Sequence, residues 1–174
     1  MDKNTRLNAL DVALNNEMKE REFYLENARR TQNPLGKAMF SRIADDELEH
    51  YERLKELHGI WEKEGKWPET IPLTVNKTNI GEILVSTLKT IDKTAKPGAD
   101  DLEAITIACT FEEKGVLFYS ELADSSEDPR EKEFFTLLSM IENEHYLSLR
   151  NAEEYFADPT SWFVRAEHHT LDGA

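Results

Sequence analysis

The chain contains two copies of the same segment. When the 174-residue sequence is shifted by 95 positions, residues 7–54 align with residues 102–149 without a gap, and 17 of the 48 aligned positions are identical. Unrelated helical segments of this length would share on the order of 3. The repeat predicts two copies of one structural unit related by a pseudo-two-fold axis. A site on that axis would be built from pairs of equivalent residues.

Each copy has the pattern of a helical hairpin, over about 5–59 in the first and 100–156 in the second. An Asn-Pro pair at 33–34 and an Asp-Pro pair at 128–129 supply an N-cap and a first helical residue for the second helix of each hairpin. Gly59 is the expected end of that helix in the first copy. Two such hairpins predict four long antiparallel helices.

A long connection over residues 60–99 joins the two hairpins, and a short amphipathic helix is expected within it near 80–91. A tail follows over 157–174. No segment has the alternating pattern of a strand. The sequence therefore predicts an all-α protein, with one four-helix bundle over residues 1–156 made of two duplicated hairpins and a long crossover connection.

Acidic residues and histidines interrupt the apolar stripe of each predicted helix. In the first hairpin, one glutamate on the first helix and a Glu-x-x-His pair on the second lie at the same height within about one helical turn, and the repeat places the second set likewise. Glu26 and Glu121 are also repeated, but they lie too close to the hairpin turns to join this level. The inward-facing polar residues are Glu17, Glu47, His50, Glu112, Glu142 and His145.

Four buried carboxylates need compensation. Burying one unpaired carboxylate costs several kcal/mol, so four would rival the entire stability of a domain, roughly 5–15 kcal/mol. Two divalent metal ions balance the charge, and Glu-x-x-His pairs on facing helices are the known ligands of two-iron or two-manganese sites in helical bundles. The alternative is a polar core that is protonated or hydrated, or a site that holds zinc.

The charge and cysteine content exclude several classes of protein. The chain has 35 acidic against 21 basic residues and a net charge of −14, so we expect neither nucleic acid nor a membrane as a partner. No stretch approaches the roughly 20 apolar residues of a membrane helix. The N-terminus lacks the layout of a secretory signal, which favours the cytoplasm. Cys109 is the single cysteine, which rules out an internal disulfide and a cysteine-built metal site.

The doubled pattern Ala-x-x-x-Glu-x-x-x-x-x-Phe-Tyr-x-x-x-Ala, at 13–28 and 108–123, and the two Glu-x-x-His pairs resemble the ferritin-like superfamily and, within it, the rubrerythrin-like proteins. The resemblance covers roughly residues 5–156. It implies a ferritin-like bundle with a non-haem diiron centre whose ligands are the six residues named above. Glu47 and Glu142 would bridge the two irons.

The resemblance also bears on residues beside the ligands. An aspartate two positions before Glu47 is common in such proteins, whereas the extra carboxylate expected three residues after the third-helix glutamate is replaced by Gly115. The first copy carries a glutamate at the position equivalent to that glycine. The residues expected beside the ligands are Glu20, Tyr24, Asp45 and Tyr119.

The function that this resemblance implies is a cytoplasmic diiron oxidoreductase that reduces hydrogen peroxide or oxygen. The four cysteines of a rubredoxin domain are missing, so an external electron donor such as a rubredoxin-like protein is expected, and the expected assembly is a homodimer. The alternatives are a non-enzymatic iron-binding or storage protein and a structural bundle that holds zinc. Manganese is also compatible with these ligands.

Overall fold

The computed structural model describes residues 3–68 and 98–162. Its four long helices are α1 (Lys3–Arg30), α2 (Pro34–Glu64), α4 (Ala99–Asp124) and α5 (Pro129–Ala157). The described residues contain no strand, which confirms the all-α prediction. The short helix expected in the crossover and most of the C-terminal tail lie outside the described residues.

The predicted caps form at the turn of each hairpin. The Asn33 side chain accepts hydrogen bonds from the backbone N–H groups of Leu35 and Gly36, and Pro34 is the first residue of α2. Asp128 caps α5 in the same way, through the backbone N–H of Arg130. These bonds satisfy amide groups that have no partner within the helix, and they fix where the second helix of each hairpin begins.

Helix α2 continues past Gly59, where the sequence predicted its end. Gly59 lies inside the helix, and the end comes at Gly65, whose φ of 65° is left-handed and whose N–H bonds to the carbonyl of Trp61. A glycine in a helix costs about 1 kcal/mol relative to alanine, which a long packed helix tolerates. The left-handed conformation at Gly65 is the stronger stop signal because few other residues adopt it.

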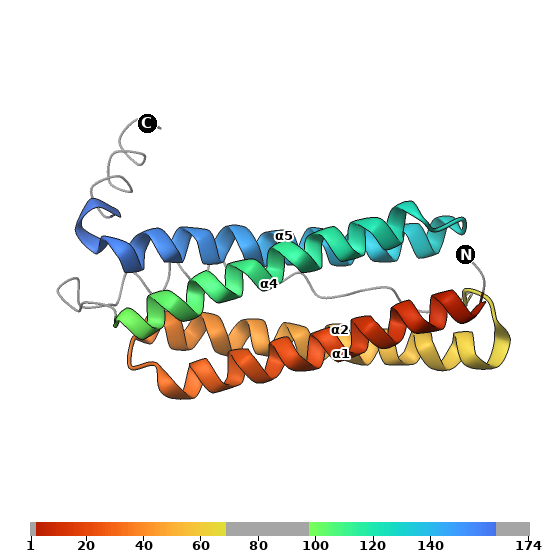
Figure 1. The fold of residues 1–174 in the computed structure, drawn as a ribbon, viewed down its shortest axis with the longest axis horizontal. Helices are drawn as coiled ribbons and strands as arrows, with labels where there is room; N and C mark the ends of the chain where they lie inside the picture. Colours follow the sequence, from red (N-terminus) through yellow and green to blue (C-terminus); the bar gives the residue numbers. More distant parts are fainter. Residues whose placement is uncertain (1–2, 69–97, 163–174) are drawn as a thin grey trace, which may run out of the picture.

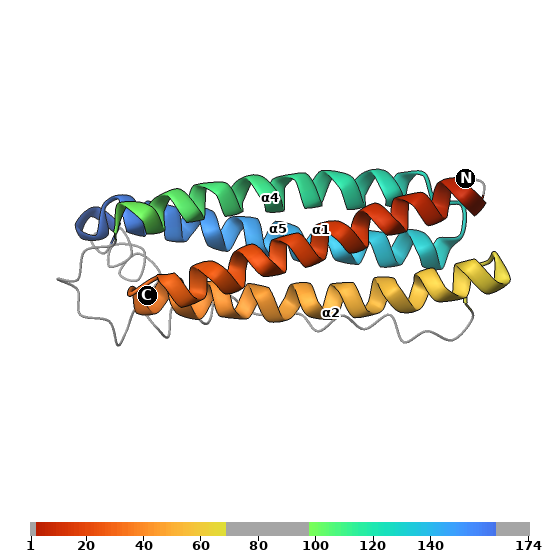
Figure 2. The ribbon, with the colours of Figure 1, turned by 60° about the horizontal axis from the view of Figure 1, so that its bottom comes forward.

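The two hairpins lie side by side along their whole length. In Figure 1, α1 and α2 run antiparallel below α4 and α5, and Figure 2 shows the same pairing after rotation. Buried apolar side chains form two clusters. One includes Ile43 and Cys109, and the other includes Ala13, Leu54 and Leu138. On each helix the predicted ligands lie in the sequence between members of the two clusters.

One buried ion pair joins the hairpins away from the predicted ligands. Arg6 on α1 contacts Glu131 on α5 through two nitrogen–oxygen pairs, Nε to Oε1 at 2.8 Å and Nη2 to Oε2 at 3.0 Å. Both side chains are 3% exposed. Such a two-pronged contact fixes the relative position of the helices as well as pairing the charges.

None of the described helices is long and apolar enough to cross a membrane.

Candidate metal centre

The structure brings the six predicted ligands together in the middle of the bundle, one or two from each helix. Their side chains are at most 3% exposed. Among the described residues, the ion pairs of the four carboxylates are with the two histidines alone. The predicted ligands fall into two groups of four that share Glu47 and Glu142. The first group adds Glu17 and His50, and the second adds Glu112 and His145.

The first group surrounds one nitrogen of His50. Nδ1 lies 3.2 Å from an oxygen of Glu17, 3.1 Å from an oxygen of Glu47 and 3.2 Å from an oxygen of Glu142. A ring nitrogen carries one proton, so it can donate to only one of the three. A metal ion satisfies all four groups at once, because each can give it a lone pair.

The second group is arranged around Nδ1 of His145. This nitrogen lies 3.3 Å from an oxygen of Glu112, 3.5 Å from one of Glu47 and 3.6 Å from one of Glu142. The repeat thus produces the same arrangement twice. The sequence predicted this pairing of the two copies from the spacing of the motifs.

Glu47 and Glu142 each face both histidines. Oε2 of Glu47 is the oxygen near His50, and its Oε1 is the one near His145. Glu142 presents Oε1 to His50 and Oε2 to His145. Each of these two carboxylates therefore has one oxygen toward each half of the site, whereas Glu17 and Glu112 each face one half only.

Without metal, the surroundings of the centre favour the protonated forms of four of its six groups. Burial raises the pKa of Glu17 and Glu112 well above the usual value, and neighbouring carboxylates add to the shift at both residues. Burial alone would lower the pKa of His50 and of His145, but the carboxylates around each ring raise both values well above 6.5. The raised pKa values of the two glutamates and of the two imidazoles all act to reduce the net negative charge that the metal-free centre buries.

Two tyrosines form hydrogen bonds between the hairpins at the predicted ligands. Tyr24 on α1 donates a hydrogen bond to Glu112 on α4, and Tyr119 on α4 donates one to Glu17 on α1. Burial, followed by the charge of the accepting glutamate, raises the pKa of each phenol well above 10, so each remains a donor. Both tyrosines lie beside the ligands, where the sequence placed them.

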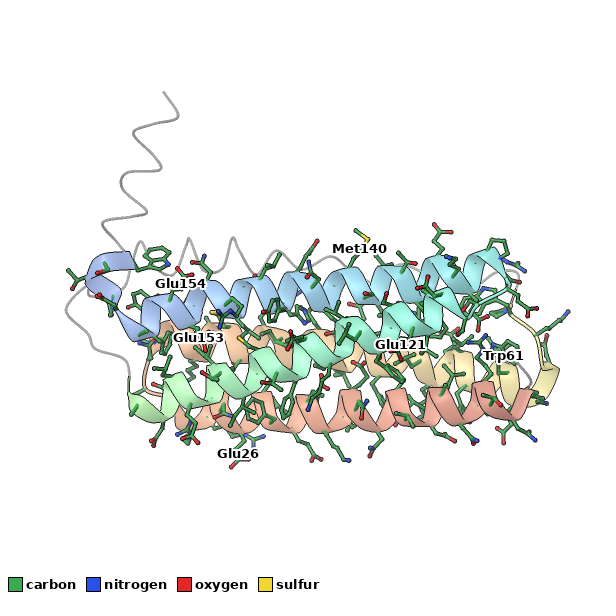
Figure 3. All side chains as sticks on the ribbon, turned by 45° about the horizontal axis from the view of Figure 1, so that its top comes forward. Glu26, Trp61, Glu121, Met140, Glu153 and Glu154 are labelled. Carbon is green, nitrogen blue, oxygen red and sulfur yellow. The ribbon has the colours of Figure 1, made fainter. Side chains whose placement is uncertain are left out.

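The aspartate beside the centre is Asp46, one residue after the predicted Asp45. Oδ2 of Asp46 lies 3.3 Å from Nε2 of His145, and its Oδ1 pairs with Arg42 at 3.1 Å. Asp45 is exposed, as is its repeat equivalent Met140, which points away from the bundle in Figure 3. Successive helical residues are about 100° apart, so a shift of one position changes the face.

Asp46 makes the two halves of the centre different. Its equivalent in the second copy is Ile141, so the aspartate serves one half of the centre only. Nε2 of His50 is buried and has no hydrogen-bond partner among the described residues, whereas Nε2 of His145 faces Asp46. An acceptor at this nitrogen leaves the lone pair of Nδ1 directed at the metal position, so the two halves are chemically different.

Glu20 lies beside a pocket that reaches the centre. The pocket has a volume of about 380 Å³, and its lining includes Glu17, Glu20 and Glu142. Glu20 is half-buried, and burial, then the charges of Glu47 and Glu142, raise its pKa to about 11. Glu26 and Glu121 are exposed, as the height argument predicted, and Figure 3 shows Glu26 pointing away from α1.

The donor set fits two metal ions. Both oxygens of Glu142, Oε1 of Glu47 and Oε2 of Glu112 are buried and have no hydrogen-bond partner of good geometry among the described residues. Buried polar atoms are rarely left so, and here they converge on two points flanked by imidazole nitrogens. Nitrogen and carboxylate ligands of this kind suit iron, manganese and zinc.

Comparison with known proteins agrees with this site. The family model described as Rubrerythrin matches residues 8–153 of the chain, a range that includes all six predicted ligands. No curated protein matches, and no solved structure matches. The match to the family model spans all four helices and both copies of the repeat, and the chain therefore belongs to the rubrerythrin family.

Proposed function

We propose that the protein is a non-haem diiron oxidoreductase that reduces hydrogen peroxide to water. The observation that carries the proposal is the position of Glu47 and Glu142, each with one oxygen toward His50 and one toward His145. Shared carboxylates hold two ions close enough to act on one substrate. Two ferrous ions, when bound, would supply the two electrons that peroxide reduction requires.

Access to the centre supports catalysis over a purely structural role. Structural zinc sites are closed by four protein ligands, whereas catalytic metal sites keep an open position. Here a pocket between α1 and α4 reaches Glu17 and Glu142. A small substrate can therefore reach the metal positions from this side.

The residues of the chain have separate tasks in this proposal. Glu17 and Glu112 would each hold one ion from one side, and the phenols of Tyr24 and Tyr119 keep these carboxylates oriented. Water formation consumes two protons for each peroxide. Glu20 lines the pocket and carries a proton on its carboxyl group when the metal is absent, so it is positioned to transfer one.

The same proposal includes an electron donor, an oligomeric state and a location for the protein. Reduction of each peroxide consumes two electrons, so the proposal requires an external one-electron donor such as a rubredoxin-like protein. We further propose a homodimer located in the cytoplasm. The net charge of −14 argues against nucleic acid and anionic membranes as partners.

The test is an anaerobic titration of the ferrous protein with hydrogen peroxide. We expect about two irons per chain, one peroxide consumed for each pair of irons oxidised, and catalytic turnover when reductant is added. Iron that is oxidised with this stoichiometry but re-reduced too slowly for turnover would favour storage. Zinc in the protein from its native host, and no turnover after loading with iron, would favour the structural alternative.

A further inference from the structure

The pocket that reaches the centre is much larger than hydrogen peroxide requires. Its volume is about 380 Å³. A water molecule takes up about 30 Å³ in the liquid, and peroxide has only one more oxygen atom. Most of the pocket would stay filled with water if peroxide were its only ligand.

The pocket lies where the two copies of the repeat differ at one position. Gly115 lines it on α4, and the equivalent residue in the first copy is Glu20, which lines it on α1. A Cβ atom at Gly115 would lie 3.2 Å from Cγ of Glu142. Any side chain at this position would therefore extend over Glu142, where the pocket meets the metal centre.

The walls of the pocket as a whole carry more apolar than polar surface, and the glutamates of the lining lie at the metal centre. The half-buried rings of Phe111 and Phe118 form part of the α4 side. The exposed Lys19 and Lys114, equivalent in the repeat, also line it, and the carbon stems of lysines cover apolar surface while the charged ends stay in water. Apolar walls with a few polar groups at one end are typical of sites for small organic molecules.

We propose that the pocket binds the organic part of an alkyl or aryl hydroperoxide, R–O–O–H. This inference rests on the proposed peroxide reduction and names its substrate class. The O–O–H end lies toward Glu17 and Glu142, and the group R lies between Phe111 and Phe118. In the reaction, R–O–O–H, two protons and two electrons give R–O–H and water. The O–O bond breaks, and the electrons come from the external one-electron donor.

The first test compares cumene hydroperoxide with hydrogen peroxide on the iron-loaded wild-type protein. Burial of the organic group predicts a kcat/KM that is about tenfold or more higher for cumene hydroperoxide. This comparison needs no variant. A kcat/KM that is higher for hydrogen peroxide would overturn the inference but leave the proposed function intact. No turnover with either peroxide would overturn the proposed function itself.

The second test narrows the pocket. Asn16 is half-buried in its lining, and its equivalent in the repeat is Phe111, so Asn16→Phe places a ring that the second copy already accommodates. The ratio of the two kcat/KM values, organic over inorganic, is expected to fall about tenfold or more. Asn15→Phe is the matched control because Asn15 is exposed. An unchanged ratio in Asn16→Phe would contradict the inference.

A binding measurement gives a readout that is independent of turnover. Cumyl alcohol, the product of cumene hydroperoxide reduction, is titrated calorimetrically into the protein as purified, in the oxidised state. Wild type and Asn15→Phe are expected to bind it, and Asn16→Phe to bind it about tenfold or more weakly. Equal affinity in all three proteins, or no binding to the wild type, would show that the organic group does not occupy this pocket.

Discussion

Tyr24 on α1 donates a hydrogen bond from its hydroxyl to Glu112 on α4, across the boundary between the two hairpins. The repeat produces the same bond in the opposite direction, from Tyr119 on α4 to Glu17 on α1. The two glutamates that each face one histidine are thus held by the opposite hairpin. These reciprocal bonds connect the packing of the hairpins to the geometry of the metal centre.

Replacing Tyr24 with phenylalanine removes one of these donors and leaves a buried carboxyl without it. We expect the free energy of unfolding of the metal-free protein to fall by about 1–3 kcal/mol, the usual cost of leaving a buried polar group without its hydrogen-bond partner. Urea unfolding measures the change. Tyr51→Phe serves as the control because it removes the same hydroxyl from a half-exposed position. Equal effects of the two substitutions would contradict a special role for Tyr24.

The shared carboxylates should behave differently from the others. Glu142→Ala removes an oxygen from each of the two metal positions, so we expect loss of both ions and of turnover, and Glu47→Ala should behave alike. Glu112→Ala removes oxygens from the metal position near His145 only. The ion near His50 should therefore stay bound more tightly than the ion near His145. Metal analysis after dialysis measures the difference. Unchanged metal content in Glu142→Ala would refute the assignment of this ligand.

Asp46 should control the affinity of one half of the centre. Asp46→Asn replaces the carboxylate that contacts Nε2 of His145, and such substitutions typically lower metal affinity by about 10–100-fold. Asp45→Asn is a matched control on the exposed face of the same helix. Competition with a chelator measures both affinities. If the two variants lose metal equally, the contact between Asp46 and His145 has no role in binding.

Metal binding should release protons. Glu17, Glu112, His50 and His145 bind protons more tightly than free side chains in the metal-free protein, because the pKa values of all four are raised. Metal ligands must be deprotonated, so loading two ions should release protons. Calorimetry in buffers of different ionisation enthalpy counts them. Release of no protons would contradict the protonation assigned to the metal-free centre.

The same shifts set the pH dependence of stability. A glutamate with a raised pKa binds its proton more tightly in the folded than in the unfolded protein, so its contribution is lost as pH rises above about 4.3. Glu17 and Glu112 should therefore make the metal-free protein less stable from about pH 5 upward. The metal-loaded protein should gain stability over the same range, because protons compete with the metal. Thermal unfolding of both forms at several pH values tests this divergence.

The buried ion pair between Arg6 and Glu131 should matter for folding rather than for the metal. Arg6→Met leaves Glu131 buried without its cation, and the expected loss of stability is about 3–5 kcal/mol. Arg30→Met breaks an ion pair with Asp100 whose side chains are 41% and 82% exposed, and it should cost about 0–1 kcal/mol. Similar losses in the two variants would contradict the difference in burial as the cause.

The sequence predicted the helices and the six inward-facing residues because both depend on spacing along a helix. The repeat added the pairing of Glu17 with Glu112 and of His50 with His145. Caps at Asn33 and Asp128 were recognisable because they precede a proline and need only local bonds. These features are all determined within one hairpin or by comparing its two copies.

Contacts between the hairpins were harder to predict. Asp45 and Asp46 are neighbours in sequence, and the choice between them depends on where α5 places His145 relative to α2. The end of α2 was missed because Gly59 and Gly65 are both plausible stops, and only the backbone conformation distinguishes them. The ion pair of Arg6 with Glu131 joins residues 125 positions apart, so no local sequence pattern could predict it.

The most direct test of the central claim is the metal content of the protein purified anaerobically from its native host, combined with electron paramagnetic resonance after oxidation. We expect about two irons per chain. Bridging by Glu47 and Glu142 should couple them magnetically, so that the fully oxidised protein gives no ferric signal. One metal ion per chain, or two irons with the signals of isolated ferric ions, would contradict a centre built on two shared carboxylates.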